Sequence, residues 1–213
     1  MAALGFVVLS ACGGAVAAGH PGQSLARVAG TACLKPILAT AVVVEDDLLL
    51  TVAHAVAGSE PDLAVIDSSG TERIAVVVAF DPERDLALLQ AEGFKEAIEL
   101  AAPQEGAEGT IAAVDSDLVV KASPYRIIRL VTASLGDIYD QGQFLRQVIE
   151  IEADVSPGDS GAPLLDGSGE MVGMIFATSE GVEESAWATH VSEIETFLGS
   201  PRSGDDVDRG RCR

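Results

Sequence analysis

The apolar residues of this chain lie in short runs that are bounded by Gly, Pro, Ser and Asp. Runs of about four to eight such residues favour β-strands, whereas an amphipathic helix needs a longer stretch with a helical repeat. Aromatic residues make up only 4% of the chain, and Val, Ala, Leu and Ile supply most of the 48% that is hydrophobic. The sequence therefore predicts a chain built mostly of strands that pack in small layers.

Turn-forming residues divide the chain into two halves. Residues 101–109 contain one proline and two glycines and predict a connector. We expect an N-terminal β-barrel over residues 28–100, a C-terminal β-barrel with a short helix over residues 110–198, and a polar tail over residues 199–213. Ser192 is the expected N-cap of the helix. The expected strands are two within residues 38–56, then 62–67, 74–80, 86–90, 110–114, 127–135, 148–153, 163–165, 170–177 and 186–190, with the helix over 191–198.

The first 18 residues contain no charged side chain, and residues 2–11 form an apolar stretch. This length and composition are typical of an export leader, which we expect over residues 1–18. Residues 9–12 (L-S-A-C) resemble a bacterial lipobox, which would place a lipid on Cys12, whereas residues 15–17 (A-V-A) fit ordinary signal cleavage. Both alternatives stay open, and both predict an exported protein, periplasmic or extracellular.

Two cysteines remain once Cys12 is set aside, namely Cys33 and Cys212. In the oxidising compartment that an export leader implies, an even number of cysteines favours a disulfide over free thiols. This bridge would close a loop of nearly the whole domain and anchor the polar tail, which we otherwise expect to be disordered.

The formal net charge of the chain is -20. Such a field repels the nucleic-acid backbone and anionic lipid surfaces, so we expect no nucleic-acid partner and membrane attachment only through a lipid on Cys12. The three histidines and three cysteines are dispersed along the chain, so the sequence predicts no metal centre and no cofactor.

The segment 158–161 (G-D-S-G) carries the clearest chemical signal. Acyl transfer needs a serine hydroxyl on a tight, glycine-supported turn whose backbone N–H groups can bind an oxyanion. Upstream, His54 lies in T-V-A-H-A-V and Asp85 in D-P-E-R-D-L-A-L-L. Base, orienting acid and nucleophile therefore occur in the order His54, Asp85, Ser160.

These two blocks and S-P-G-D-S-G-A-P-L around Ser160 resemble the signature segments of trypsin-like serine peptidases. The separations, 31 residues from His54 to Asp85 and 75 from Asp85 to Ser160, are most similar to bacterial HtrA-type and acid-resistance periplasmic proteases. The resemblance covers about residues 38–198. It implies an all-β fold of two six-stranded antiparallel β-barrels with a short C-terminal helix. It also implies a serine endopeptidase that cleaves exported or misfolded polypeptides.

The resemblance assigns a role to each residue of this triad. Ser160 would attack the peptide carbonyl, His54 would take its proton and pass it to the leaving amine, and Asp85 would orient the imidazole. The backbone N–H groups of Gly158 and Ser160 would form the oxyanion hole. HtrA-type enzymes commonly carry a PDZ domain that does not follow here, so we expect a free-standing and monomeric protease domain.

Asp154 stands six residues before Ser160, where trypsin-like enzymes carry the acid that receives a substrate Arg or Lys. HtrA-type enzymes with an Asp near this point prefer small aliphatic residues, so both preferences stay open. The expected wall of the substrate pocket is apolar and consists of Ile175, Phe176, Ala177 and Trp187.

Asp159 departs from the HtrA pattern, which has Asn before the serine. In trypsin-type enzymes an Asp here receives a newly cut N-terminus, and the bond between Arg27 and Val28 faintly resembles such an activation site. The arm after Val28 is short, so we expect Asp159 to find another partner or backbone donors.

Other interpretations of these residues remain. His20 and His190 are alternative bases by residue type alone, although neither matches the family blocks. A misarranged triad would leave a catalytically silent binding protein on the same fold.

Overall fold

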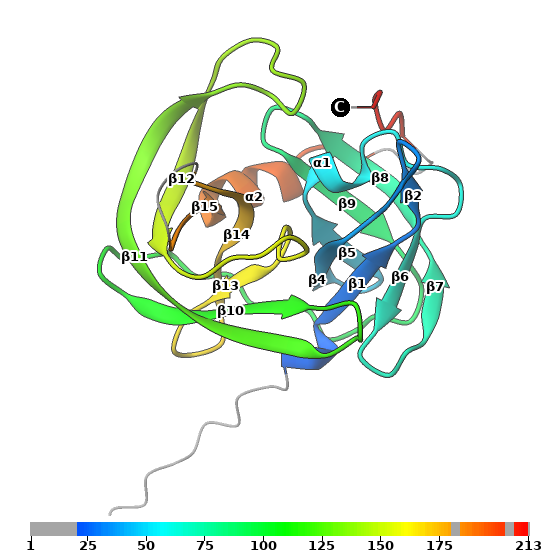
Figure 1. Cartoon of the computed structure of the whole chain (residues 1–213), viewed down its shortest axis with the longest axis horizontal. Helices are drawn as coiled ribbons and strands as arrows, with labels where there is room; N and C mark the ends of the chain where they lie inside the picture. The colour runs from blue at the N-terminus through cyan, green and yellow to red at the C-terminus, as the bar shows by residue number, and fades with distance from the viewer. Residues whose placement is uncertain (1–20, 180–183, 203–206, 213) are drawn as a thin grey trace, which may run out of the picture.

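The structure, a computed structural model, describes residues 21–179, 184–202 and 207–212. Figure 1 shows two β units side by side, the N-terminal one in blue to teal and the C-terminal one in green to orange. The N-terminal unit contains η1 (Pro21–Gln23), β1 (Leu25–Ala29), β2 (Thr31–Ala32), β3 (Lys35–Pro36), β4 (Ala39–Glu45), β5 (Leu48–Thr51), α1 (Ala53–Val56), β6 (Ala64–Asp67), β7 (Glu72–Ile74), β8 (Val76–Asp81) and β9 (Leu86–Gln90). The C-terminal unit contains β10 (Glu108–Val114), β11 (Val120–Leu135), β12 (Phe144–Glu152), β13 (Pro163–Leu165), β14 (Met171–Thr178), β15 (Ser185–His190) and α2 (Val191–Leu198). The expected leader, with Cys12 and His20, lies outside the described residues.

The N-terminal unit is a seven-stranded antiparallel sheet in the order β7-β6-β1-β4-β5-β9-β8. Its edge strands β7 and β8 follow each other in the chain and are separated only by Ala75. The Ala75 N–H donates to the Leu63 carbonyl at 2.9 Å, beside β6. The chain therefore passes at Ala75 from one edge of the sheet to the other, and the sheet is rolled. Seven strands are present where a six-stranded barrel was expected: the five strands placed by sequence become six because 74–80 is interrupted at Ala75, and β1 is the seventh.

The C-terminal unit is a closed antiparallel barrel in the order β10-β11-β12-β15-β14-β13, with the six strands that were expected. Strand β11 has 16 residues and is longer than the expected 127–135. Its first half pairs with β10 and its second half with β12, so it crosses both sides of the barrel. Small and polar residues alternate in the first half, which therefore lacks the apolar run that marks a strand.

Apolar side chains fill the inside of each unit and the layer between them. Leu49 belongs to the cluster inside the N-terminal sheet, and Ile149 belongs to the cluster inside the barrel. Leu50 points the other way and packs with Met174 and Ile194 of the C-terminal unit. Because successive strand residues face opposite sides, β5 contributes to both layers. The shared apolar layer fixes one unit against the other.

Strand β1 was missed by the sequence analysis and lies in the middle of the N-terminal sheet, between β6 and β4. Arg27 interrupts its apolar run, and the N-terminal unit consequently begins before residue 28. Val28 is fully buried and pairs with strands on both sides. The bond between Arg27 and Val28 is therefore inside a central strand, which argues against activation by cleavage at this point.

Helix α2 has the expected bounds, but its N-cap differs from the expected one. The cap residue is His190, whose Nδ1 accepts the N–H of Ser192 at 3.0 Å. The buried face of the helix consists of Val191, Ile194 and Phe197. This spacing of about one turn places the helix against the layer between the two units.

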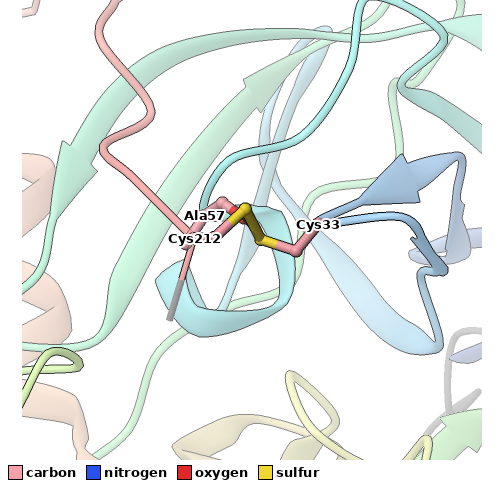
Figure 2. Close-up of a disulfide and its surroundings, with 3 residues drawn as sticks. All are labelled: Cys33, Ala57 and Cys212. Atoms are coloured by element: carbon pink, nitrogen blue, oxygen red, sulfur yellow. Dashed lines mark hydrogen bonds between the residues drawn. A yellow bond between two sulfur atoms is a disulfide. The ribbon is translucent and has the colours of Figure 1, made fainter.

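Cys33 and Cys212 form the expected disulfide, with 5.4 Å between their Cα atoms. Figure 2 shows the bridge beside the end of helix α1. The Arg209 carbonyl also accepts the N–H of Gly58 at 3.1 Å, and the Val207 N–H donates to the Val77 carbonyl at 3.0 Å. Residues 207–212 are thus packed on the N-terminal unit.

Candidate active site

The carboxylate of Asp85 holds His54 by two hydrogen bonds. Nδ1 of His54 donates to Oδ2 at 2.7 Å, and the backbone N–H of His54 donates to Oδ1 at 2.8 Å. His54 lies on the one-turn helix α1, directly after β5. Because Nδ1 carries the proton that faces Asp85, Nε2 is the ring nitrogen that can accept another. The two bonds therefore fix both the orientation and the tautomer of the ring.

Asp85 is 5% exposed and has φ +57°, a backbone conformation that aspartate tolerates better than most residues. The turn before it is closed by the Asp81 carboxylate, which accepts the N–H groups of Glu83 and Arg84 at 2.9 Å each. The Arg84 side chain bonds Asp81 and also Glu193 of helix α2, each at 2.9 Å. The hydrogen bond that Arg84 donates to Asp81 raises the pKa of Arg84. The turn that presents Asp85 is thus anchored to the C-terminal helix.

Ser160 lies in a turn that is closed by its own hydrogen bonds. The Asp159 N–H donates to the Ser156 carbonyl at 3.0 Å, and Asp159 Oδ2 accepts the Ser156 N–H at 2.8 Å. Asp159 therefore has the backbone donor that was expected in place of a new N-terminus. Gly158 and Gly161 have φ +105° and +82°, so the turn needs residues without a β-carbon.

Both β units hold this turn. The Ser160 carbonyl accepts the N–H of Thr40, in β4, at 2.9 Å, and the Gly161 N–H donates to the Ile175 carbonyl, in β14, at 2.8 Å. A β-carbon on Gly161 would collide with the Thr40 carbonyl oxygen. Ser160 is consequently fixed at the junction of the two units, by backbone bonds from each of them.

Thr40 is a site residue that the sequence analysis missed. It is fully buried, its carbonyl accepts the Thr51 hydroxyl at 2.8 Å, and its own Oγ1 accepts the Val114 N–H at 3.0 Å. Thr51 lies three residues before His54. Thr40 is thus hydrogen-bonded to Thr51 of the strand before His54, to the turn that carries Ser160, and to β10. A threonine inside an apolar run is ordinary in strands, so nothing in the sequence marked it.

We expect Thr40→Val to lower the free energy of unfolding by about 1–3 kcal/mol, because valine keeps the shape but leaves the buried Val114 N–H without an acceptor. Urea unfolding at neutral pH measures the change. Thr132→Val is the matched control at an exposed strand position and should change stability by less than about 0.5 kcal/mol. Equal losses in the two variants would contradict the role given to Thr40.

Within the described part of the chain, the N–H groups of Gly158 and Ser160 donate to no acceptor. Both residues are partly exposed beside the serine. Two backbone donors beside the Ser160 side chain are therefore unused by the described residues.

The four apolar residues expected to form one pocket wall lie on different faces. Ile175 is 1% exposed and its side chain is inside the barrel core, so it forms no wall. Phe176 lies at a bulge of β14 and packs on the layer between the two units. Ala177 pairs with Trp187, whose ring lies 6.0 Å from the guanidinium of Arg129. The expected wall is thus divided, because neighbouring residues of a strand face opposite sides.

Asp154 is exposed and lies beside the nucleophile turn. It lines a hollow of about 350 Å³ together with Gly158 and Asp159. Arg27 and Lys121 line the same hollow. The lining of this hollow thus combines charged residues with apolar ones such as Leu38 and Val114.

A second hollow, of about 650 Å³, lies beside His54. It is lined by residues 32–38, by the end of helix α1 and by Cys212. Leu34 and Leu38 are 89% and 51% exposed in this region. The histidine therefore borders an open groove whose lining is mostly apolar.

His190 is occupied as the cap of helix α2, where its Nδ1 bonds both the N–H and the hydroxyl of Ser192. Burial lowers the pKa of His190.

Over residues 21–179, 184–202 and 207–212, no group of three His, Cys, Asp or Glu side chains could hold a metal ion. No helix in the described part of the chain is long and apolar enough to cross a membrane.

Known proteins with similar sequences are serine proteases. A family model described as trypsin-like peptidase domain matches residues 39–174. Serine protease Rv3671c of Mycobacterium tuberculosis is 30% identical over 201 residues, which are 92% of this chain and 50% of that protein. A probable periplasmic serine endoprotease, DegP-like, of Brucella suis is 29% identical over 176 residues, 79% of this chain and 33% of that protein. The chain thus spans about half, or less, of the length of these relatives.

The solved structures show the same fold. The active form of the Rv3671c protease from M. tuberculosis superimposes with a TM-score of 0.85 at 28% identity, over 90% of this chain and 86% of that one. The inactive form of the same protease gives a TM-score of 0.72 over 84% of this chain and 91% of that one. The overall arrangement is therefore more similar to the active form. On the strength of the matched residues and the fold, the chain belongs to the trypsin-like peptidase domain family.

Proposed function

We propose that this protein is a serine endopeptidase that cleaves polypeptides through Ser160, His54 and Asp85. The observation that carries the proposal is the two-point hydrogen bonding of His54 by the Asp85 carboxylate. This geometry leaves Nε2 as the proton acceptor and is what a serine nucleophile requires of its base.

In the proposed reaction the Ser160 hydroxyl attacks the peptide carbonyl carbon while its proton passes to Nε2 of His54. Asp85 stabilises the imidazolium that forms. The N–H groups of Gly158 and Ser160 donate to the oxyanion, and a single such donor is typically worth about 3 kcal/mol of transition-state stabilisation. The imidazolium then protonates the leaving amine, and water, activated by the same histidine, hydrolyses the acyl-enzyme.

A polypeptide is the substrate that fits the surroundings of His54. The groove formed by residues 32–38 offers an open and mostly apolar surface on one side of the histidine. An extended chain can lie along such a surface, whereas a small ester would leave most of it uncovered.

The protein is also proposed to act after export, in the periplasm or the extracellular space, as a monomer. The disulfide between Cys33 and Cys212 is typical of an oxidising compartment, and DegP-like relatives are named as periplasmic. Attachment to the membrane would depend on a lipid at Cys12. The intact mass of the mature protein tests this point. If the parent protein carries a lipid on Cys12, the Cys12→Ala variant lacks the mass of that lipid and no longer fractionates with the membrane.

The nucleophile is tested by labelling the leaderless protein with a fluorophosphonate and measuring its intact mass. We expect one label per molecule on Ser160 and none in Ser160→Ala. Ser168→Ala is the matched control, since Ser168 is an exposed serine on the turn after β13, and it should label like the parent protein. A folded parent protein that takes no label would refute the proposal and favour a catalytically silent binding protein.

A further inference from the structure

Arg146 is a buried cation to which the mechanism above gives no task. It lies on β12 and is 6% exposed. In the described part of the chain, Asp85 and Arg146 are the only charged residues that are buried to this degree. Burying a charge away from water is expensive unless hydrogen bonds or an opposite charge compensate it. The surroundings of both residues must therefore show how each charge is compensated.

Among the described residues, neither charge has an ionic partner in contact with it while His54 is neutral. The hydrogen bonds that the Asp85 carboxylate accepts from these residues come from His54 alone. The guanidinium of Arg146 lies 5.4 Å from the centre of the Phe176 ring, and its Nη2 donates to the Gly136 carbonyl at 3.4 Å. Its Nε has no acceptor in the described part of the chain. Each buried charge thus lacks a counter-charge in direct contact.

Glu193 of helix α2 brings the two charges into one region. One oxygen of its carboxylate accepts Nε of Arg84, the residue before Asp85, at 2.9 Å. The other oxygen accepts the backbone N–H of Gln147, the residue after Arg146, at 2.9 Å. Asp85 and Arg146 are therefore neighbours in the chain of the two groups that this one carboxylate joins.

The loop between β11 and β12 makes a second connection. It begins at Gly136, whose carbonyl accepts the guanidinium of Arg146. Two residues later the N–H of Ile138 donates to the carbonyl of Pro82 at 3.0 Å, in the turn that presents Asp85. The loop that holds the cation is thus hydrogen-bonded to the turn that holds the anion.

Nearby charges act on Arg146 through the protein interior. Burial lowers the pKa of Arg146, the negative charges of Asp85, Glu193 and Asp81 oppose this effect, and the positive charge of Arg84 adds to it. Asp81 and Glu193 are already paired with Arg84. Asp85 is consequently the carboxylate whose charge Arg146 is left to balance.

Other ionisable groups near these contacts are engaged elsewhere or exposed. Asp137 accepts two backbone N–H groups of its own turn, and His190 caps helix α2 through Nδ1. Glu195 of α2 is exposed, as is Lys35 in the groove on the other side of His54. Strand β14, which contributes the aromatic ring, has no ionisable side chain.

We propose that Arg146 is a positioning residue that keeps the Asp85 carboxylate ionised and thereby sets the lowest pH at which His54 can act as a base. The proposal rests on the proposed peptidase function and deepens it. A buried cation stabilises a neighbouring carboxylate and disfavours a second cation, here the imidazolium of His54. Both effects make the coupled His54–Asp85 pair bind protons less readily, so activity extends to lower pH. Sequence reasoning missed Arg146, because an arginine in a strand next to polar residues is usually exposed.

The test measures the acid midpoint, the pH at which kcat/KM for a peptide amide falls to half of its plateau. Loss of the cation lets the pair take up protons at higher pH. The acid midpoint should therefore rise by about one pH unit in the neutral variants Arg146→Met and Arg146→Gln, with the plateau within about threefold of the parent protein. Arg146→Lys keeps the charge and should keep the midpoint within about 0.3 unit.

Arg129→Met is the matched control, because it removes the same charge from an exposed strand position. It should leave the acid midpoint within about 0.2 unit of the parent value. The rise in Arg146→Met should also persist in about 1 M salt, since salt screens buried charges far less than exposed ones. A rise that salt abolishes would contradict the proposal.

An unchanged midpoint in both neutral variants would overturn the proposal and leave Arg146 a packing residue, whatever happens to the plateau. An equal rise in Arg146→Lys would overturn it as well, because the cause would then be shape and not charge. The midpoint is a ratio measured within one sample, so partial unfolding of a variant does not move it.

NMR titration of the His54 ring in Ser160→Ala protein, with and without Arg146→Met, reads the effect of the cation without a substrate. Fluorophosphonate labelling of the parent protein decides the proposed function separately. A labelled parent protein whose midpoints do not move in Arg146→Met sinks the inference alone. An unlabelled parent protein refutes the proposed function, and the titration of His54 then still shows whether Arg146 controls its protonation.

Discussion

Replacement of Asp85 by asparagine is expected to lower kcat/KM for peptide hydrolysis by about 10⁴, with the fold retained. The carboxylate uses one oxygen for the backbone N–H of His54 and the other for Nδ1. Asparagine offers a single oxygen, and its NH₂ group then faces one of these two donors. With the oxygen on the backbone N–H, the ring must carry its proton on Nε2, where it can no longer accept the proton of Ser160. Steady-state kinetics at neutral pH measures the loss.

Asp166→Asn is the matched control for this change. Asp166 also accepts two backbone N–H groups at a turn, those of Ser168 and Glu170, but it has no contact with His54. Its replacement should alter kcat/KM by less than about twofold. Retention of more than about a tenth of the activity in Asp85→Asn would contradict the role of Asp85 in setting the tautomer.

Loss of the disulfide is expected to have the largest effect on stability. In leaderless protein, Cys33→Ser combined with Cys212→Ser should lower the free energy of unfolding by about 4 kcal/mol and Tm by roughly 10 °C. The bridge joins positions 179 residues apart, so it restricts nearly the whole unfolded chain. Urea and thermal unfolding measure both quantities.

The reduced parent protein is the control for this pair of substitutions, because it lacks the bridge but keeps both sulfur atoms. It should unfold at the same urea concentration as the double variant. A loss below about 1 kcal/mol in both samples would show that the cross-link restrains the unfolded chain far less than its length implies.

The sequence predicted the elements whose apolar runs end at clear turn residues. Strand β9 and helix α2 have the expected bounds of 86–90 and 191–198. Strand β1 was missed because Arg27 interrupts its run. The break at Ala75 has no glycine or proline to mark it and follows from the path of the chain around the rolled sheet.

The candidate catalytic residues were easier to identify in the sequence than the residues around them. Proton transfer and nucleophilic attack restrict the residue types, so His54, Asp85 and Ser160 stand out in a linear sequence. A pocket wall depends on which face of a strand each side chain takes. The sequence placed Ile175 and Phe176 on one wall, whereas the structure places them on opposite sides of β14.

The hydrogen bond between the Ser160 carbonyl and the Thr40 N–H joins the two halves of the chain, and it therefore affects when a newly synthesised chain can become active. His54 and Asp85 belong to the half that emerges first from the ribosome, and the serine turn belongs to the half that emerges last. Under the proposed mechanism, a folded N-terminal half alone has an oriented histidine but no nucleophile. A folded C-terminal half alone has the serine but lacks the hydrogen bond from Thr40 that holds its turn. Proteolytic activity then arises only after both halves have docked, so partly folded copies cannot cleave one another.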